Sequence, residues 1–113
     1  MGRTNNFLGE FEQMVLLAIL QLGTEAFGGT ISEELEGRAA RRVSRGALYS
    51  SLDRLERKGY LRWDIAPATS ARGGQPKRRF EVTPEGLDAI RLSHEAWVNM
   101  TDGLEDLLQK RTP

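Results

Sequence analysis

Apolar positions in the first 40 residues predict two helices. Residues 14–22, MVLLAILQL, are apolar on nearly every side, which is typical of a helix buried on more than one face. We expect this helix to run from about Gly9 to Leu22 and to stop at Gly23. Thr30 is the expected N-cap of a short second helix, ISEELEGRA, with Glu33 completing a capping box.

A third helix is expected in SRGALYSSLDRLERKGYL, residues 44–61. Ser44 is a preferred N-cap residue, and Gly59 supplies a C-terminal stop. Between them three leucines, at positions 48, 52 and 55, recur at helical spacing. These leucines belong in a core, so the small, polar and charged residues on the other side of the helix face a partner or solvent.

After the third helix the period changes to two, which predicts strands. Residues 61–65 alternate between apolar and polar, and Phe80 and Val82 share one face of a return strand over 78–82. The connection APATSARGGQPK is rich in glycine, proline and small residues. We therefore expect a hairpin, and we expect Trp63 to pack in the core rather than to stack on a base.

The last segment predicts one long helix, with Thr83 as N-cap and Pro84 at the first helical position. At 1.5 Å per residue, a helix from Pro84 to Gln109 would be about 39 Å long. Its inward positions step by three and four as in a heptad seam. We expect this seam to form a homodimer, together with two phenylalanines near the first helix, and the expected dimerisation residues are Phe7, Phe11, Leu87, Ile90, His94, Trp97, Thr101, Leu104 and Leu108.

Three helices followed by a two-stranded hairpin are typical of the winged helix-turn-helix, in which the third helix lies in the DNA major groove. The predicted fold class is mainly α with a small β-hairpin. We expect a winged helix-turn-helix DNA-binding domain over residues 1–83 and a C-terminal dimerisation helix over residues 84–113.

Charge is distributed unevenly, although the formal net charge is zero. Residues 41–63 carry seven basic and two acidic residues, and residues 64–83 carry four basic and two acidic ones, whereas both flanks are acidic. A basic middle segment is what phosphate binding uses. A solvated charged face would give the same pattern. A winged-helix protein-interaction module, the alternative to DNA binding, is expected to be acidic there instead.

Helical geometry selects the residues of the third helix that face DNA. With the leucines inward, 100° per residue places Gly46, Ser50, Asp53 and Arg57 opposite them. Gly46 either permits close approach of the backbone or is an ordinary tolerated glycine. Tyr49 either donates its hydroxyl to a phosphate or is half-buried in the core. The cations Arg45, Arg54 and Lys58 can contact phosphate, and the expected DNA-binding residues of this helix are Ser44, Arg45, Gly46, Tyr49, Ser50 and Arg54.

The hairpin carries four further cations around the sequence GGQP, at positions 72, 77, 78 and 79. Charged loops are often only solvated, but a basic hairpin beside a helix-turn-helix favours phosphate contact. The expected DNA-binding residues of the wing are Arg72, Gly73, Gly74, Lys77 and Arg78.

Composition argues against several other classes. With 113 residues and 39% hydrophobic content the chain suits one small domain, and it has no cysteine for disulfides or thiolate metal sites. No apolar run approaches the ~20 residues of a membrane span, and the first residues lack a signal-peptide pattern, so we expect a cytoplasmic protein with no membrane partner.

Catalysis has little support in the sequence. The one histidine, His94, lies on the seam, and no P-loop or dinucleotide-binding glycine pattern occurs. The acidic pairs Glu10/Glu12 and Glu33/Glu34 are expected on helix surfaces. We therefore expect no enzyme, no cofactor and no metal site. RNA binding is a weaker option, because no aromatic stacking platform is visible and the A-form major groove excludes a helix.

Three segments occur in an order that resembles a known family: LGEFEQMVLLAIL, then GALYSSLDRLERKGYL, then GG followed by KRRFEVTPEG. With similar gaps, they resemble the PadR family of bacterial transcriptional regulators over about residues 8–92. The resemblance implies a winged-helix homodimer that binds an inverted-repeat operator, usually as a repressor, through the third helix and the wing. The short C-terminal segment is similar to the compact subfamily, which has no separate ligand domain.

Trp97 is the candidate residue for a small-molecule site. It lies on the seam between His94 and Thr101, so a dimer would bring two indoles near a common axis. Some relatives in the compact PadR subfamily hold flat aromatic compounds between such helices, and the resemblance implies a small aromatic effector here. Alternatively, Trp97 fills the dimer interface with Phe7 or Phe11 of the partner.

Overall fold

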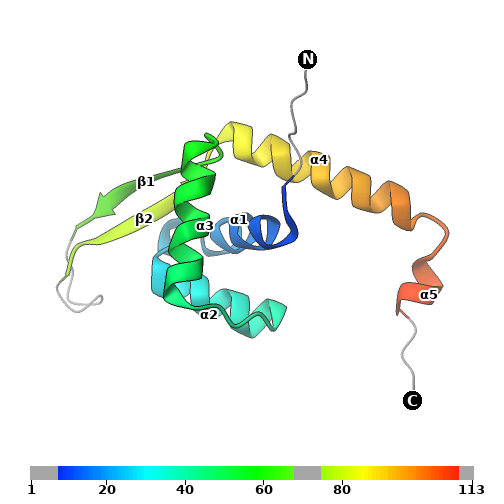
Figure 1. Ribbon diagram of the computed structural model, residues 1–113, viewed down its shortest axis with the longest axis horizontal. Helices are drawn as coiled ribbons and strands as arrows, with labels where there is room; N and C mark the ends of the chain where they lie inside the picture. Colours follow the sequence, from blue (N-terminus) through cyan, green and yellow to red (C-terminus); the bar gives the residue numbers. More distant parts are fainter. Residues whose placement is uncertain (1–7, 68–74, 110–113) are drawn as a thin grey trace.

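The computed structural model describes residues 8–67 and 75–109. These residues form a mainly helical molecule with a two-stranded antiparallel hairpin at one end and a long helix leaving the other (Figure 1). The predicted fold class is confirmed. The elements are α1 (Glu10–Leu22), the 3-10 turn η1 (Gly23–Glu25), α2 (Gly28–Ala39), α3 (Arg45–Arg57), β1 (Leu61–Ala66), β2 (Lys77–Val82), α4 (Pro84–Thr101) and α5 (Glu105–Gln109).

α1 is the central helix of the core. It contacts α2, α3, α4 and β2, so its apolar residues are buried on more than one side, as the sequence predicted. α2, α3, the first half of α4 and the base of the hairpin pack around it. The core contains Val15, Leu16 and Ile19 of α1, Ile31 and Leu35 of α2, Leu48, Leu52 and Leu55 of α3, and Leu61 and Phe80 of the hairpin.

Two of the three predicted N-caps are confirmed. The Oγ of Ser44 accepts a hydrogen bond from the Ala47 N–H at 3.1 Å. The prediction for α2 is wrong, because its N-cap is Phe27 and not Thr30. The first helical hydrogen bond runs from Ile31 N to the Phe27 carbonyl at 2.8 Å, and the Thr30 hydroxyl reaches back to accept the Phe27 N–H at 2.9 Å. The two glycines after Phe27 therefore belong to the helix.

The hairpin joins the core through its base, whereas two large apolar residues further along β1 stay exposed. The Phe80 N–H donates to the Ala26 carbonyl at 2.8 Å, which ties β2 to the chain before α2. Phe80 is 2% exposed, whereas Trp63, opposite it in the register, is 39% exposed and Ile65 is 55% exposed. The expectation that Trp63 packs in the core is therefore wrong. The hairpin extends away from the helices, so little of its apolar face can pack against them (Figure 1).

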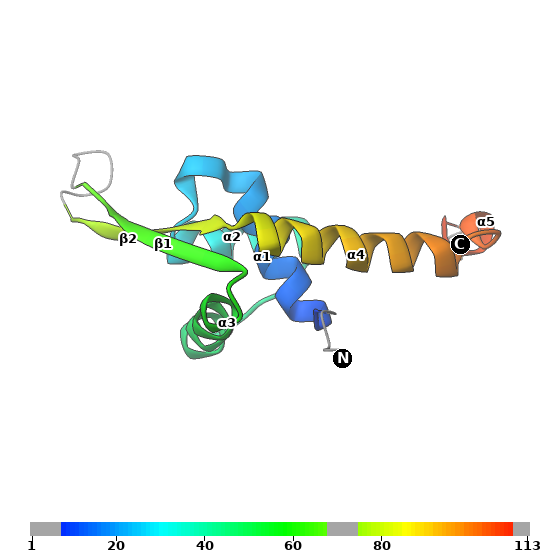
Figure 2. The ribbon, with the colours of Figure 1, turned by 90° about the horizontal axis from the view of Figure 1, so that it is seen from above.

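The predicted single helix from Pro84 to Gln109 is also wrong. α4 ends at Thr101, because Asp102 leaves the helical conformation and Gly103 adopts φ +85°, a value that favours glycine. α4 packs against the core through its first half only, and Figure 2 shows its second half and α5 extending beyond the rest of the molecule. Within the described residues, no helix is both long and apolar enough to cross a membrane.

Candidate nucleic-acid interface

The start of α2, the start of α3 and the start of β2 border an open pocket of about 690 Å³. Five of the predicted DNA-binding residues meet in this pocket, although they come from two separate segments of the chain. Three of the lining residues are cations, so the pocket favours an anionic partner. We call it the basic pocket, and it is lined by Phe27, Gly28, Gly29, Arg45, Gly46, Tyr49, Pro76, Lys77 and Arg78.

Tyr49 joins three elements in the wall of the basic pocket. Its half-buried ring lies edge-on to Phe80, with the ring centroids 6.4 Å apart. Its hydroxyl lies against the first turn of α2, where a Cβ added to Gly28 would stand 2.2 Å from the oxygen. The ring is therefore half-buried beside the core, which was one of the two alternatives predicted for Tyr49. The residue also lines the basic pocket.

Arg78 lies among three aromatic rings. Its guanidinium carbon is 4.7 Å from the ring centroid of Trp63, 5.5 Å from that of Tyr49 and 5.6 Å from that of Phe80. Arg45 also approaches the Tyr49 ring, at 5.3 Å. Cations within about 6 Å of a ring face are attracted by its quadrupole. Arg45 of α3 and Arg78 of the wing therefore both contact the ring of Tyr49.

Arg54 and Lys58 lie away from the basic pocket. Arg54 Nε donates to Glu12 Oε2 at 3.1 Å, and Lys58 Nζ donates to both Glu12 oxygens at 2.9 and 3.1 Å. Glu12 is only 6% exposed, so its expected place on the helix surface is wrong. The reason is that the flank of α3 with the two cations packs over α1. The sequence could have predicted this burial, because Glu12 lies on the same side of α1 as the buried Val15, Leu16 and Ile19.

The electrostatics of Glu12 follow from this arrangement. Burial raises the pKa of the carboxyl group, but hydrogen bonds from Lys58, the Gly9 N–H and Arg54 outweigh burial and hold the pKa below its ordinary value. Glu12 is therefore a carboxylate at neutral pH, and it binds two cations of α3.

The remaining predicted DNA-binding residues are placed as follows. Ser50 is exposed on the same side of α3 as Gly46. Among the described residues nothing lies within 4 Å of a Cβ added to Gly46, so packing within the chain does not account for this glycine. Ser44 uses its side chain as the N-cap of α3. The predicted residues that lie outside the described ranges are Phe7, Arg72, Gly73 and Gly74.

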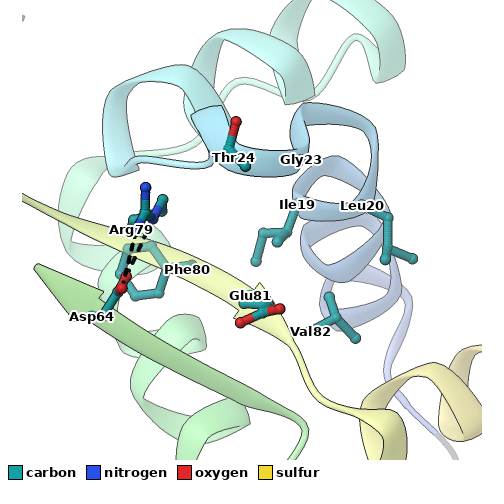
Figure 3. Close-up of a pocket in the computed structure, with 9 residues that line it drawn as sticks. All are labelled: Ile19, Leu20, Gly23, Thr24, Asp64, Arg79, Phe80, Glu81 and Val82. Atoms are coloured by element: carbon teal, nitrogen blue, oxygen red, sulfur yellow. Dashed lines mark hydrogen bonds and ion pairs between the residues drawn. The ribbon is translucent and has the colours of Figure 1, made fainter. Parts of the chain in front are cut away.

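A second pocket, of about 490 Å³, borders β2 closer to α1. In Figure 3 Ile19, Leu20 and Val82 form its apolar wall, and the paired Asp64 and Arg79 stand at the opposite end. Arg79 Nη2 donates to Asp64 Oδ2 at 3.0 Å, and this hydrogen bond lowers the pKa of Asp64. The fourth wing cation is thus paired within the hairpin and does not line the basic pocket.

The predicted dimerisation residues divide into two groups. Phe11 and Ile90 pack half-buried against the core of their own chain, and Leu87 is also half-buried. The Arg41 guanidinium lies 5.4 Å from the Phe11 ring centroid. Beyond them the apolar side chains of α4 and α5 become exposed, and Trp97 reaches 62%. We call these residues the exposed apolar stripe: Trp97, Val98, Met100, Leu104, Leu107 and Leu108.

No metal site accompanies these surfaces in the part of the chain that the structure describes, where no three histidine or carboxylate side chains are grouped to hold an ion. The basic pocket therefore offers cations, backbone and one phenol to a ligand, which is the chemistry of phosphate binding.

Comparison with known proteins identifies the family. A sequence profile described as the transcriptional regulator PadR-like family matches residues 16–92. A PadR-like transcriptional regulator from Bacillus cereus has a similar structure, with a TM-score of 0.70, 24% identity, and coverage of 89% of this chain and 93% of that chain. A PadR family regulator from Eggerthella lenta is also similar, with a TM-score of 0.63, 27% identity, and coverage of 90% of this chain and 88% of that chain.

A third similar structure, a winged-helix DNA-binding protein from STIV, has a TM-score of 0.67 at 20% identity and covers 83% of this chain and 94% of that chain. No curated protein sequence matches this chain at a significant level. The profile spans the chain from the middle of α1 to the middle of α4, which includes α3 and the hairpin. Members of this family are transcriptional regulators and not enzymes, which confirms the prediction that this chain is no enzyme. The chain belongs to the PadR-like family of transcriptional regulators and has their winged-helix DNA-binding fold.

Proposed function

We propose that this protein is a homodimeric repressor that binds an inverted-repeat DNA operator. The observation that carries the proposal is the basic pocket, where Arg45, Lys77 and Arg78 surround the start of α3. Regulators of this family bind DNA. In a winged helix the third helix enters the major groove, and neighbouring cations contact the phosphate backbone.

Each part of the surface has a separate role in this proposal. Gly46 and Ser50 are exposed and small, so α3 can approach the edges of the bases. Arg45 and Lys77 neutralise phosphates beside the groove. Arg78 links the wing to α3 through its aromatic contacts. Arg72, Gly73 and Gly74, which lie outside the described residues, keep their predicted role as contacts to the DNA backbone. Residues 1–83 form the DNA-binding part, and residues 84–113 the dimerisation part.

The homodimer is supported by the exposed apolar stripe. All six residues of the stripe are large, apolar and exposed, and a concentration of exposed apolar side chains commonly marks an interface between proteins. A second copy related by a two-fold axis would cover the stripe with the same residues. Two recognition helices would then reach half-sites about one helical turn, or ~34 Å, apart.

Selection of bound DNA from a random pool tests the proposal. We expect a palindromic sequence, because a two-fold symmetric dimer reads the same half-site twice. Failure to retain any DNA at low salt would contradict the proposal and favour a protein-interaction module.

The selected DNA then tests the separate parts of the surface. The double variant Lys77→Ala, Arg78→Ala should weaken binding to every sequence, and the slope of log affinity against log salt should flatten by about 0.9 for each phosphate that is no longer neutralised. Ser50→Ala should change the preferred sequence and leave the slope unchanged. An unchanged slope in the wing variant would contradict the role given to the wing.

We further propose that a planar small molecule binds at Trp97 and releases the DNA. Trp97 is 62% exposed on α4, so its indole is available for stacking in a dimer. The Trp63→Phe variant leaves Trp97 as the single tryptophan reporter. Planar dyes and antibiotics should quench its fluorescence and weaken operator binding. If none of them does either, Trp97 only packs in the dimer interface.

A further inference from the structure

Glu12 binds two cations of the proposed recognition helix at once. Its carboxylate accepts hydrogen bonds from Arg54 Nε, Lys58 Nζ and the Gly9 N–H. Arg54 also donates from Nη2 to Ser51 Oγ at 3.2 Å, so its guanidinium is held on the side of α3 that faces α1. The contacts cross between two elements, 42 and 46 residues apart in the sequence.

The burial of this cluster is asymmetric. The Glu12 side chain is 8% exposed, whereas the Arg54 and Lys58 side chains are 46% and 39% exposed. The acid therefore cannot leave its position without opening the contact between α1 and α3. Both cations stand at the surface on long, flexible side chains. Without the carboxylate, each could turn toward the exposed face of α3, where Ser50, Asp53 and Arg57 lie.

We propose that Glu12 is a specificity-determining residue that holds Arg54 and Lys58 against α1 and keeps both cations from contacting DNA phosphates. The inference rests on the proposed DNA binding. Contacts to phosphates raise affinity for every sequence, whereas contacts to base edges distinguish one sequence from another. By withholding two cations, Glu12 lowers non-specific affinity and leaves a larger share of the binding to the bases that α3 reads.

The variant Glu12→Gln removes the charge and keeps both the side-chain volume and an acceptor for the Gly9 N–H. For a random-sequence duplex, measured by fluorescence anisotropy, we expect the salt slope to steepen by up to about 1.8 per subunit, from two new phosphate contacts. Between about 50 and 200 mM salt, the affinity of the variant should fall, for each subunit that binds, on the order of tenfold more than that of the wild type. The ratio of operator to random-duplex affinity should decrease.

Two further variants show whether the effect comes from the freed cations. Glu95→Gln makes the same change of charge on the exposed surface of α4 and should leave the salt slope unchanged. Adding Arg54→Ala and Lys58→Ala to Glu12→Gln should restore the wild-type slope. A Glu12→Gln slope equal to that of Glu95→Gln would overturn the inference.

If Glu12→Gln does not fold, the single variant Arg54→Ala tests whether Arg54 contacts DNA phosphates. Arg54→Ala leaves Glu12 paired with Lys58. We expect it to keep the wild-type slope, whereas Arg45→Ala should flatten the slope by about 0.9. Equal flattening by both variants would show that Arg54 contacts phosphate. That result would overturn this inference and leave the proposed function standing. Wild-type protein that binds no DNA at low salt would overturn the proposed function and this inference together.

Discussion

At the scale of single residues, Gly28 and Tyr49 determine how closely α2 approaches α3. The Tyr49 hydroxyl occupies the space that a side chain at position 28 would need. The ring itself is held between Phe80, Arg45 and Arg78. Because neighbours restrain the ring, a larger residue at position 28 must displace the ring, the start of α2, or both.

Gly28→Ala should therefore destabilise the protein by about 1–3 kcal/mol, the usual cost of overpacking. Gly29→Ala is the matched control, since nothing lies within 4 Å of its Cβ and alanine is favoured in a helix by about 0.5–1 kcal/mol. Urea unfolding measures both. Adding Tyr49→Phe to Gly28→Ala should recover part of the stability, because the hydroxyl oxygen is the closest atom. Equal stability of the two alanine variants would contradict this account.

The pairing of Glu12 predicts how stability depends on pH. Its pKa in the folded protein lies below the ordinary value of 4.5, so near and below that pH the unfolded chain binds more protons at this site. The contribution of Glu12 is fully present above pH 4.5 and is lost as the pH falls through the lowered folded pKa. Urea unfolding from neutral to acidic pH should show the stability difference between wild type and Glu12→Gln shrinking in this window. A constant difference would mean that the charge of Glu12 does not stabilise the fold.

At the scale of elements, the junction before α4 connects the end of α3, the hairpin and α4. The Thr83 hydroxyl donates to the Gly59 carbonyl at 2.7 Å and accepts the Gly86 N–H at 3.0 Å. The Thr83 N–H donates to the Tyr60 carbonyl at 3.1 Å. Gly86 itself packs so tightly that an added Cβ would stand 2.2 Å from the Tyr60 carbonyl oxygen. The direction in which α4 leaves the body is therefore determined by the end of α3.

Thr83→Ala removes the N-cap of α4 and the hydrogen bond to the end of α3, and it should cost about 0.5–2 kcal/mol. Thr83→Ser retains the hydroxyl and should keep most of the stability. The free energy of unfolding in urea distinguishes the two variants. If alanine and serine behave alike, the methyl group rather than the cap matters at this position.

At the scale of the whole molecule, α4 carries its apolar residues beyond the body that it packs on. Gly86, Ala89 and Ser93 are buried, and the exposed apolar stripe begins past them. Leu107 and Leu108 of α5 continue the stripe. α5 itself lies past the end of α4 and outside the body of the molecule (Figures 1 and 2). In the proposed dimer, this half of α4 and α5 gain their packing from the second copy.

Trp97→Asp combined with Leu104→Asp should convert the proposed dimer into a folded monomer, because both side chains are exposed within one chain. Sedimentation velocity at micromolar concentration measures the change. Leu92→Asp is the control, since Leu92 is 39% exposed but borders Tyr60 and Asp88 on a different side of α4. A wild-type protein that is monomeric at this concentration would contradict the proposed homodimer.

The order and type of the elements up to α4 can be inferred from the amino-acid sequence alone, whereas the break between α4 and α5 was not predicted. Leu48, Leu52 and Leu55 indicate the buried side of α3, and Ser44 and Thr83 indicate where two helices begin. These features depend on local conformation and periodicity, which neighbouring residues encode. The family could be inferred for the same reason, because its motifs are continuous segments of the chain.

The partner of each polar or aromatic side chain, in contrast, depends on the tertiary structure. Periodicity shows which side of a helix is apolar, but it does not show which element crosses that side or how far the core extends. Glu12 is buried because α3 packs over it, and Trp63 stays 39% exposed although its indole N–H donates to Glu56 of α3. Arg45 and Arg78 meet at Tyr49 although 33 positions separate them. Such contacts depend on how whole elements pack together, which no single segment of the sequence encodes.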